Sequence, residues 1–165
     1  MNTTKAYSKK RSITFLQFVL VLIGIVTLAV LIRFPLTEGR AENLDLISIY
    51  SDPLILFGYL ASIPFFVSLY QSFKLLKNIG RENVFSPESL KSLRIIKYCS
   101  LILGSSFIAG ILYITFFSHG DDVTGPIGLG ILATFGSIVV ATAAAVIERT
   151  LQRAVELKSE NDLTV

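Results

Sequence analysis

The four long apolar segments of this sequence contain no charged residue and no histidine. Asp, Glu, Lys, Arg and His are all missing from residues 13–32, 53–73, 98–117 and 126–147. Enzymes and ion-coupled carriers that act inside a membrane usually keep such a group at mid-membrane, because its cost there is tolerated only for function. We therefore predict that the protein is not an enzyme.

Cysteine and histidine are nearly absent, with one residue of each among 165. The single cysteine, Cys99, excludes an intrachain disulfide and a metal site built from several cysteines. We interpret it as a small buried hydrophobic residue near a helix end. The sequence also lacks a glycine-rich phosphate loop and a nucleophile paired with a base, so we predict no cofactor.

The single histidine lies in a short run, SHGDDVTGP, that has no Lys or Arg. Imidazole and two carboxylates suit a divalent transition metal, which makes His119, Asp121 and Asp122 the candidate metal ligands. One exposed run without a second, distant ligand does not define a site, and an acidic outer loop needs no metal. We predict no metal site.

Apolar residues are abundant: 52% of the chain is hydrophobic and 16% is charged. This balance is too apolar for an ordinary soluble domain. The run 13–32 covers about 30 Å as a helix, the hydrocarbon thickness of a bilayer, and no small-x-small cleavage site follows it. The sequence predicts one all-α membrane domain over 1–165, with transmembrane helices at 13–34, 53–73, 95–117 and 126–147.

The basic residues predict the orientation of these helices. Thirteen of the fifteen Lys and Arg residues lie in three segments, residues 1–12, 74–97 and 148–165, and only Arg33 and Arg40 lie in an outer connection. Basic residues stay on the cytoplasmic side, so we predict an up-down four-helix bundle, N-in and C-in. Its cytosolic parts are the tail 1–12, the basic loop 74–94 and the helical tail 148–165. Topology explains the net charge of +3, and we predict no direct nucleic-acid binding.

A helix start is encoded within the basic segment. Ser86 supplies a capping hydroxyl, Pro87 suits the first helical position, and Glu88 suits the positive end of the helix dipole. The helix that begins there is expected to continue into the third span. Its basic line, which consists of Lys91, Arg94 and Lys97, could bind anionic lipid headgroups or could serve only as a flank that sets the topology.

Pro64 lies inside the second predicted span. Its ring removes one backbone hydrogen bond and frees the carbonyl group of Leu60, so we expect a bend there. The bend is either a functional hinge or a tolerated kink.

The fourth predicted span is rich in small residues. A small-residue stripe follows one side of it at four-residue spacing, and it consists of Ala133, Ser137, Ala141 and Ala145. Small residues allow close packing of helices in lipid, where the hydrophobic effect does not drive association. The stripe could pack inside one chain or form the face of a homo-oligomer.

Beyond Ile147 we expect the helix to continue into the cytosol. Its charges alternate in sign from Glu148 onward, as they do on a solvated helix, and Leu151 and Val155 form a narrow apolar side. Together with the basic line, we assign lipid or partner binding to Arg149, Arg153, Asn161, Asp162 and Leu163.

Two stretches carry a family resemblance, VFSPESLKSL at 84–93 and KSENDLTV at 158–165. They resemble the bacterial membrane family catalogued as domain of unknown function 2975. The resemblance implies a small four-span protein of the bacterial inner membrane with no established activity. Relatives are often encoded beside a helix-turn-helix regulator, which implies that the cytosolic surface binds such a regulator.

Two functional hypotheses follow. The first is a non-enzymatic membrane protein that presents its basic cytosolic loop and its C-terminal tail to a partner protein or to anionic membrane lipid. The alternative is a small oligomeric transporter, or an accessory transport subunit, in which Pro64 and the small-residue stripe line a path.

Overall fold

The computed structural model describes residues 2–37, 53–81, 83–117 and 124–162, and these contain four α-helices and no strand. Each helix is long and apolar enough to cross a bilayer. Every predicted span falls within one of them. The helices are α1 (Asn2–Thr37), α3 (Pro53–Gly80), α4 (Pro87–Phe117) and α5 (Thr124–Asp162).

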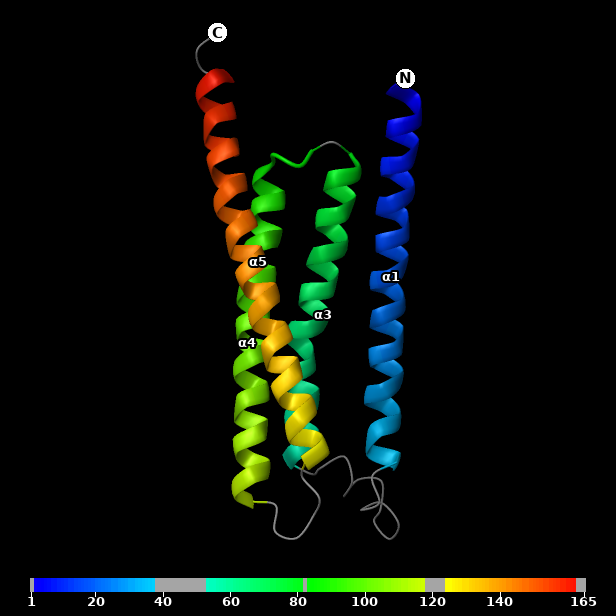
Figure 1. Cartoon of the computed structure of the whole chain (residues 1–165), viewed down its shortest axis with the longest axis vertical. Helices are drawn as coiled ribbons and strands as arrows, with labels where there is room; N and C mark the ends of the chain where they lie inside the picture. The colour runs from blue at the N-terminus through cyan, green and yellow to red at the C-terminus, as the bar shows by residue number, and fades with distance from the viewer. Residues whose placement is uncertain (1, 38–52, 82, 118–123, 163–165) are drawn as a thin grey trace.

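The helices run antiparallel to one another in chain order, as Figure 1 shows. Within the described chain, α1 packs on α3, α3 packs on α4, and α4 packs on α5. The start of α1, the α3–α4 connection and the end of α5 all lie at the same end of the molecule, which we call the basic end. The prediction of an all-α, up-down four-helix bundle is confirmed. The N-in, C-in orientation stays a prediction.

The helices extend further than the predicted spans. α1 begins at Asn2, so most of the predicted tail 1–12 is helical, because no Pro or Gly interrupts it. α3 ends only at Gly80, a residue that favours helix C-termini. The connection between α3 and α4 is therefore confined to residues 81–86, well within the predicted loop 74–94.

A buried polar cluster joins the end of α3 to the start of α4. The backbone amide of Ser89 donates to Ser86 Oγ (3.2 Å), which confirms the predicted cap before Pro87. Asn78 Nδ2 donates to Ser89 Oγ (3.3 Å), and Ser89 Oγ donates to the backbone carbonyl of Asn83 (3.3 Å). Because a buried polar group is costly without a partner, these bonds fix the tight connection at the basic end.

The apolar core of the described residues lies between α4 and α5, in the half of the molecule nearest the basic end. The buried side chains on α4 recur at intervals of three and four residues, so they form one face. Small residues of α5 lie opposite them. The buried apolar residues are Leu93, Ile96, Cys99, Leu103, Ala141, Ala144 and Leu151.

The small-residue stripe lies mainly on the side of α5 that packs against α4. Ala141 is buried, and Ala133, Ser137 and Ala145 are half-buried. A Cβ atom added to Gly104 would lie 3.5 Å from Ser137 Cβ, so the two helices approach closely there. This arrangement favours packing within one chain, and the homo-oligomer stays a prediction.

A hydrogen bond between side chain and backbone joins α1 to α3. The hydroxyl of Tyr59 donates to the backbone carbonyl of Leu31 at 2.9 Å. That carbonyl would normally accept from the amide four residues later, but this residue is Pro35, which has no N–H. Tyr59 therefore satisfies a carbonyl group that the helix itself cannot.

We predict that Ala141→Leu destabilises the contact between α4 and α5 by about 1–3 kcal/mol, because the added atoms overpack a closed interface. The measurement is thermal unfolding in detergent, followed through the reaction of a fluorogenic maleimide with Cys99, the single, buried cysteine. Ala143→Leu makes the same change on an exposed face of α5 and should leave the midpoint unchanged. Equal midpoints for the two variants would contradict this packing.

Candidate functional site

A carboxylate is buried between α4 and α5 near the basic end. The side chain of Glu148 is 9% exposed. Its Oε1 accepts from Arg94 Nε at 2.9 Å, and its Oε2 accepts from Lys97 Nζ at 2.6 Å. The Lys97 ammonium also lies 4.9 Å from the centre of the Tyr98 ring. We call Glu148, Arg94 and Lys97 the ionic clamp, because they tie the two helices together.

The positions of these residues follow from the sequence. Arg94 and Lys97 are three residues apart, so they share one face of α4. Glu148 is the first charged residue after the uncharged segment 126–147, and Lys97 is the last before the uncharged segment 98–117. Because α4 and α5 are antiparallel, the opposite charges meet at the level where both apolar segments end.

The prediction that Glu148 lies on a solvated helix is wrong. Ala144 and Leu151 lie four residues before and three residues after it, and both are buried against α4. This side of α5 therefore turns toward α4. Alternating charge is typical of an isolated, solvated helix, and this pattern does not reveal that α5 packs against α4.

The two cations of the ionic clamp contribute unequally to the stability of the contact between α4 and α5. The side chain of Arg94 is 53% exposed and that of Lys97 is 23% exposed, so solvent weakens the pair with Arg94 more. An exposed ion pair contributes about 0–1 kcal/mol. Loss of both cations would leave Glu148 as an unpaired charge, which costs about 3–5 kcal/mol at a fully buried site.

The other predicted binding residues lie around the clamp or beyond it. Lys91 on α4 and both Arg149 and Arg153 on α5 are exposed. Asn161 and Asp162 belong to the last turn of α5. Their roles in lipid or partner binding stay predictions. The structure does not describe Leu163, nor the candidate metal ligands His119, Asp121 and Asp122.

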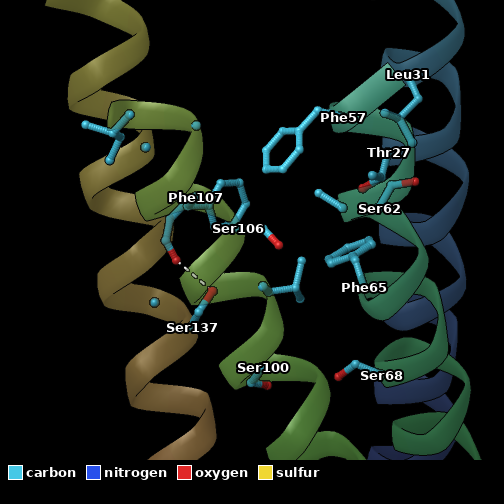
Figure 2. Close-up of a pocket in the computed structure, with 18 of the residues that line it drawn as sticks. Thr27, Leu31, Phe57, Ser62, Phe65, Ser68, Ser100, Ser106, Phe107 and Ser137 are labelled. Atoms are coloured by element: carbon cyan, nitrogen blue, oxygen red, sulfur yellow. Dashed lines mark hydrogen bonds between the residues drawn. The ribbon is translucent and has the colours of Figure 1, made fainter. Parts of the chain in front are cut away.

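A cavity of about 740 Å³ lies between the helices in the half away from the basic end, and residues of all four helices line it. Figure 2 shows Phe57 and Phe65 of α3 on one side and Ser106 and Phe107 of α4 on the other. Its wall is mostly apolar. No charged side chain lines it, so its chemistry suits an uncharged molecule.

Several hydroxyl groups of the cavity wall bond within their own helices. Ser62 donates to the carbonyl of Tyr59 at 2.7 Å, Ser106 to that of Ile102 at 2.9 Å, and Ser137 to that of Ala133 at 2.9 Å. Each bonded hydroxyl can still accept a hydrogen bond from a ligand. Pro64 adjoins Phe65 in an unbroken α3, and its role as a hinge stays a prediction.

Two contacts were missed by reasoning from the sequence alone. The burial of Glu148 could have been inferred from its place at the end of an apolar segment, level with Lys97 on the antiparallel helix. The bond from Tyr59 to Leu31 had a signal in Pro35, four residues after Leu31. The partner of that carbonyl group required the tertiary structure.

We predict that Glu148→Gln lowers the unfolding midpoint of the detergent-solubilised protein and exposes Cys99 to maleimide at a lower temperature. The change removes the negative charge and one of the two acceptor oxygens, so that one of the two cations loses its bond, which should cost about 1–3 kcal/mol. Glu156→Gln makes the same change at an exposed site on α5 and should have little effect. Equal midpoints for both variants would show that the clamp does not stabilise the pair.

Comparisons with known proteins agree with this architecture. The family model described as "Protein of unknown function (DUF2975)" matches residues 35–165. The "Uncharacterized membrane protein YoaS" of Bacillus subtilis (strain 168) is 37% identical over 158 residues, which covers 94% of this chain and 99% of that protein. No solved structure matches the chain significantly. The chain therefore belongs to the DUF2975 family of membrane proteins.

Proposed function

We propose that this protein is a non-enzymatic, multi-pass protein of the bacterial inner membrane that docks a partner protein at its basic end. The observation that carries the proposal is the projection of α5 beyond the α3–α4 connection (Figure 1). α5 continues as one helix to Asp162. This part of α5 is helical and lies outside the predicted membrane span 126–147.

The distribution of charge supports a cytosolic location for this end. Thirteen of the fifteen basic residues lie in the segments 1–12, 74–97 and 148–165. The positive-inside rule places such segments in the cytosol. The partner in this proposal is therefore a cytosolic protein.

The projecting part of α5 has the chemistry of a docking surface. Leu151 is the last buried apolar side chain of α5. The projecting part, residues 152–162, extends about 16 Å beyond it. On this part, Leu157 is 66% exposed and Arg153 is also exposed. An exposed leucine beside a cation suits an apolar pocket with an acidic rim.

The ionic clamp supports the proposal because it lies directly before the projecting part. Bonds from Arg94 and Lys97 to Glu148 fix the direction in which α5 leaves the bundle. A docking element held in one orientation loses less conformational entropy on binding than a flexible tail. A helix-turn-helix regulator, the partner implied by the family resemblance, is the first candidate.

We predict that a photo-crosslinking amino acid at position 157 gives one discrete protein adduct in living cells. Introduction of Arg153→Glu should remove the adduct, because it reverses a charge one turn away. Position 132 is the matched control, since Leu132 lies on the same helix, is 67% exposed and belongs to the predicted membrane span. The measurement is the mass shift of the tagged protein after irradiation.

The same experiment can contradict docking at α5. An adduct that is equally strong at positions 157 and 132 would reflect random collision. No adduct at position 157 in cells that also express a candidate helix-turn-helix regulator would exclude α5 as the docking site of that regulator.

Transport is the second candidate, and the cavity of about 740 Å³ favours it. Ser137 lines this cavity, so Ser137→Leu should fill part of it. If the protein is a transporter, we expect this variant to reduce the efflux of an uncharged solute from proteoliposomes at least severalfold. Ser105→Leu makes the same change on an exposed face of α4 and should preserve efflux. Efflux no faster than from protein-free vesicles, for a panel of uncharged solutes, would count against transport.

A further inference from the structure

A second groove lies between α4 and α5, next to the ionic clamp. Its cavity volume is about 330 Å³. Lys97 and Arg149 line the end nearest the basic end, while Leu101, Ala145 and Val146 line the part that runs into the predicted membrane spans. The groove therefore combines a cationic mouth with an apolar body.

The position of each group along the helices gives the groove its polarity. Ala141 and Arg149, which both line the groove, are eight residues apart on α5. That separation corresponds to about 12 Å along the helix. The small side chain of Ala145 leaves room beside Leu101 and Val146, so the body is a shallow groove along the helix pair.

The mouth carries an excess of positive charge at the level of the lipid headgroups. Lys97 and Arg149 line the mouth, and Arg94 beside it shares the carboxylate of Glu148 with Lys97. Bonds to Glu148 hold Lys97 in place, and Arg149 is exposed. Both uncharged segments, 98–117 and 126–147, end at this level, which for the predicted membrane spans is the depth of the lipid phosphate groups.

We propose that this groove binds one anionic phospholipid. Its phosphate lies between Lys97 and Arg149, and part of one acyl chain lies along Leu101 and Ala145. Charge complementarity selects the headgroup, and the apolar body selects the chain. A second copy of the protein fits poorly, because stable interfaces bury about 1,000 Å² or more and this groove spans about two helical turns.

This site is independent of the proposed docking by α5. Leu157, the centre of the docking surface, lies two turns beyond Arg149 and does not line the groove. A protein adduct at position 157 and a lipid bound in the groove can therefore each exist without the other.

Titration of the delipidated, full-length protein by native mass spectrometry tests the proposal. The probes are phosphatidylglycerol and phosphatidylcholine with identical acyl chains. We expect phosphatidylglycerol to bind more tightly than phosphatidylcholine. Arg149→Gln should weaken the binding of phosphatidylglycerol about fivefold, because one cation that contacts the headgroup is lost. Arg81→Gln, which removes an exposed cation of the α3–α4 connection outside the groove, should change the affinity less than twofold.

A second pair of variants tests the apolar body. Ala145→Leu fills the groove and should weaken the binding of phosphatidylglycerol by a similar factor. Ala143→Leu lies on the exposed face of α5 and should leave this binding unchanged. If Ala145→Leu lowers the unfolding midpoint, Thr142→Leu fills the same groove from an exposed position. Glycerol phosphate at the same concentration should not compete, because it has no acyl chain.

Four results would overturn the proposal. Equal affinity for the two lipids would remove the headgroup site. Equal weakening by Arg149→Gln and Arg81→Gln would indicate diffuse surface charge. Unchanged binding in both groove-filling variants, or full competition by glycerol phosphate, would show that no acyl chain occupies the groove.

Discussion

The contact between α4 and α5 is the constraint on which the rest of the structure depends. All the buried apolar residues of the described chain lie on these two helices, and the ionic clamp closes the same contact near the basic end. In a bilayer the hydrophobic effect does not press helices together, so close packing and polar bonds determine which helices pair. The ionic clamp supplies the polar bonds, and the small residues of α5 allow the close packing.

The two ends of the bundle differ in packing, and the difference suggests a division of roles. Near the basic end, the cluster around Ser89 and the clamp around Glu148 fix the helices in place. In the other half, the helices separate around the larger cavity. α1 contacts mainly α3, with the bond from Tyr59 to Leu31 as a specific tie. A rigid end suits docking, whereas an open half in lipid suits an uncharged ligand.

Much of the fold could be predicted from the sequence because the bilayer imposes simple rules. The absence of charge from four segments located the helices, and Ser86 with Pro87 located the start of α4. The pairing of side chains could not be predicted in the same way. Glu148 looked like one charge on a solvated helix, and its burial depends on the neighbour that α5 meets. A groove requires two helices in register, so its cationic mouth appeared only in the structure.

The ionic clamp is expected to hold α5 in one orientation at the basic end. The most direct measurement is the distance distribution between spin labels at positions 85 and 157, in a Cys99→Ala background, by pulsed electron paramagnetic resonance. Phe85 and Leu157 are both exposed, so the labels should be tolerated. We expect one narrow distribution that broadens in Glu148→Gln. A distribution of the same width with and without Glu148 would contradict it.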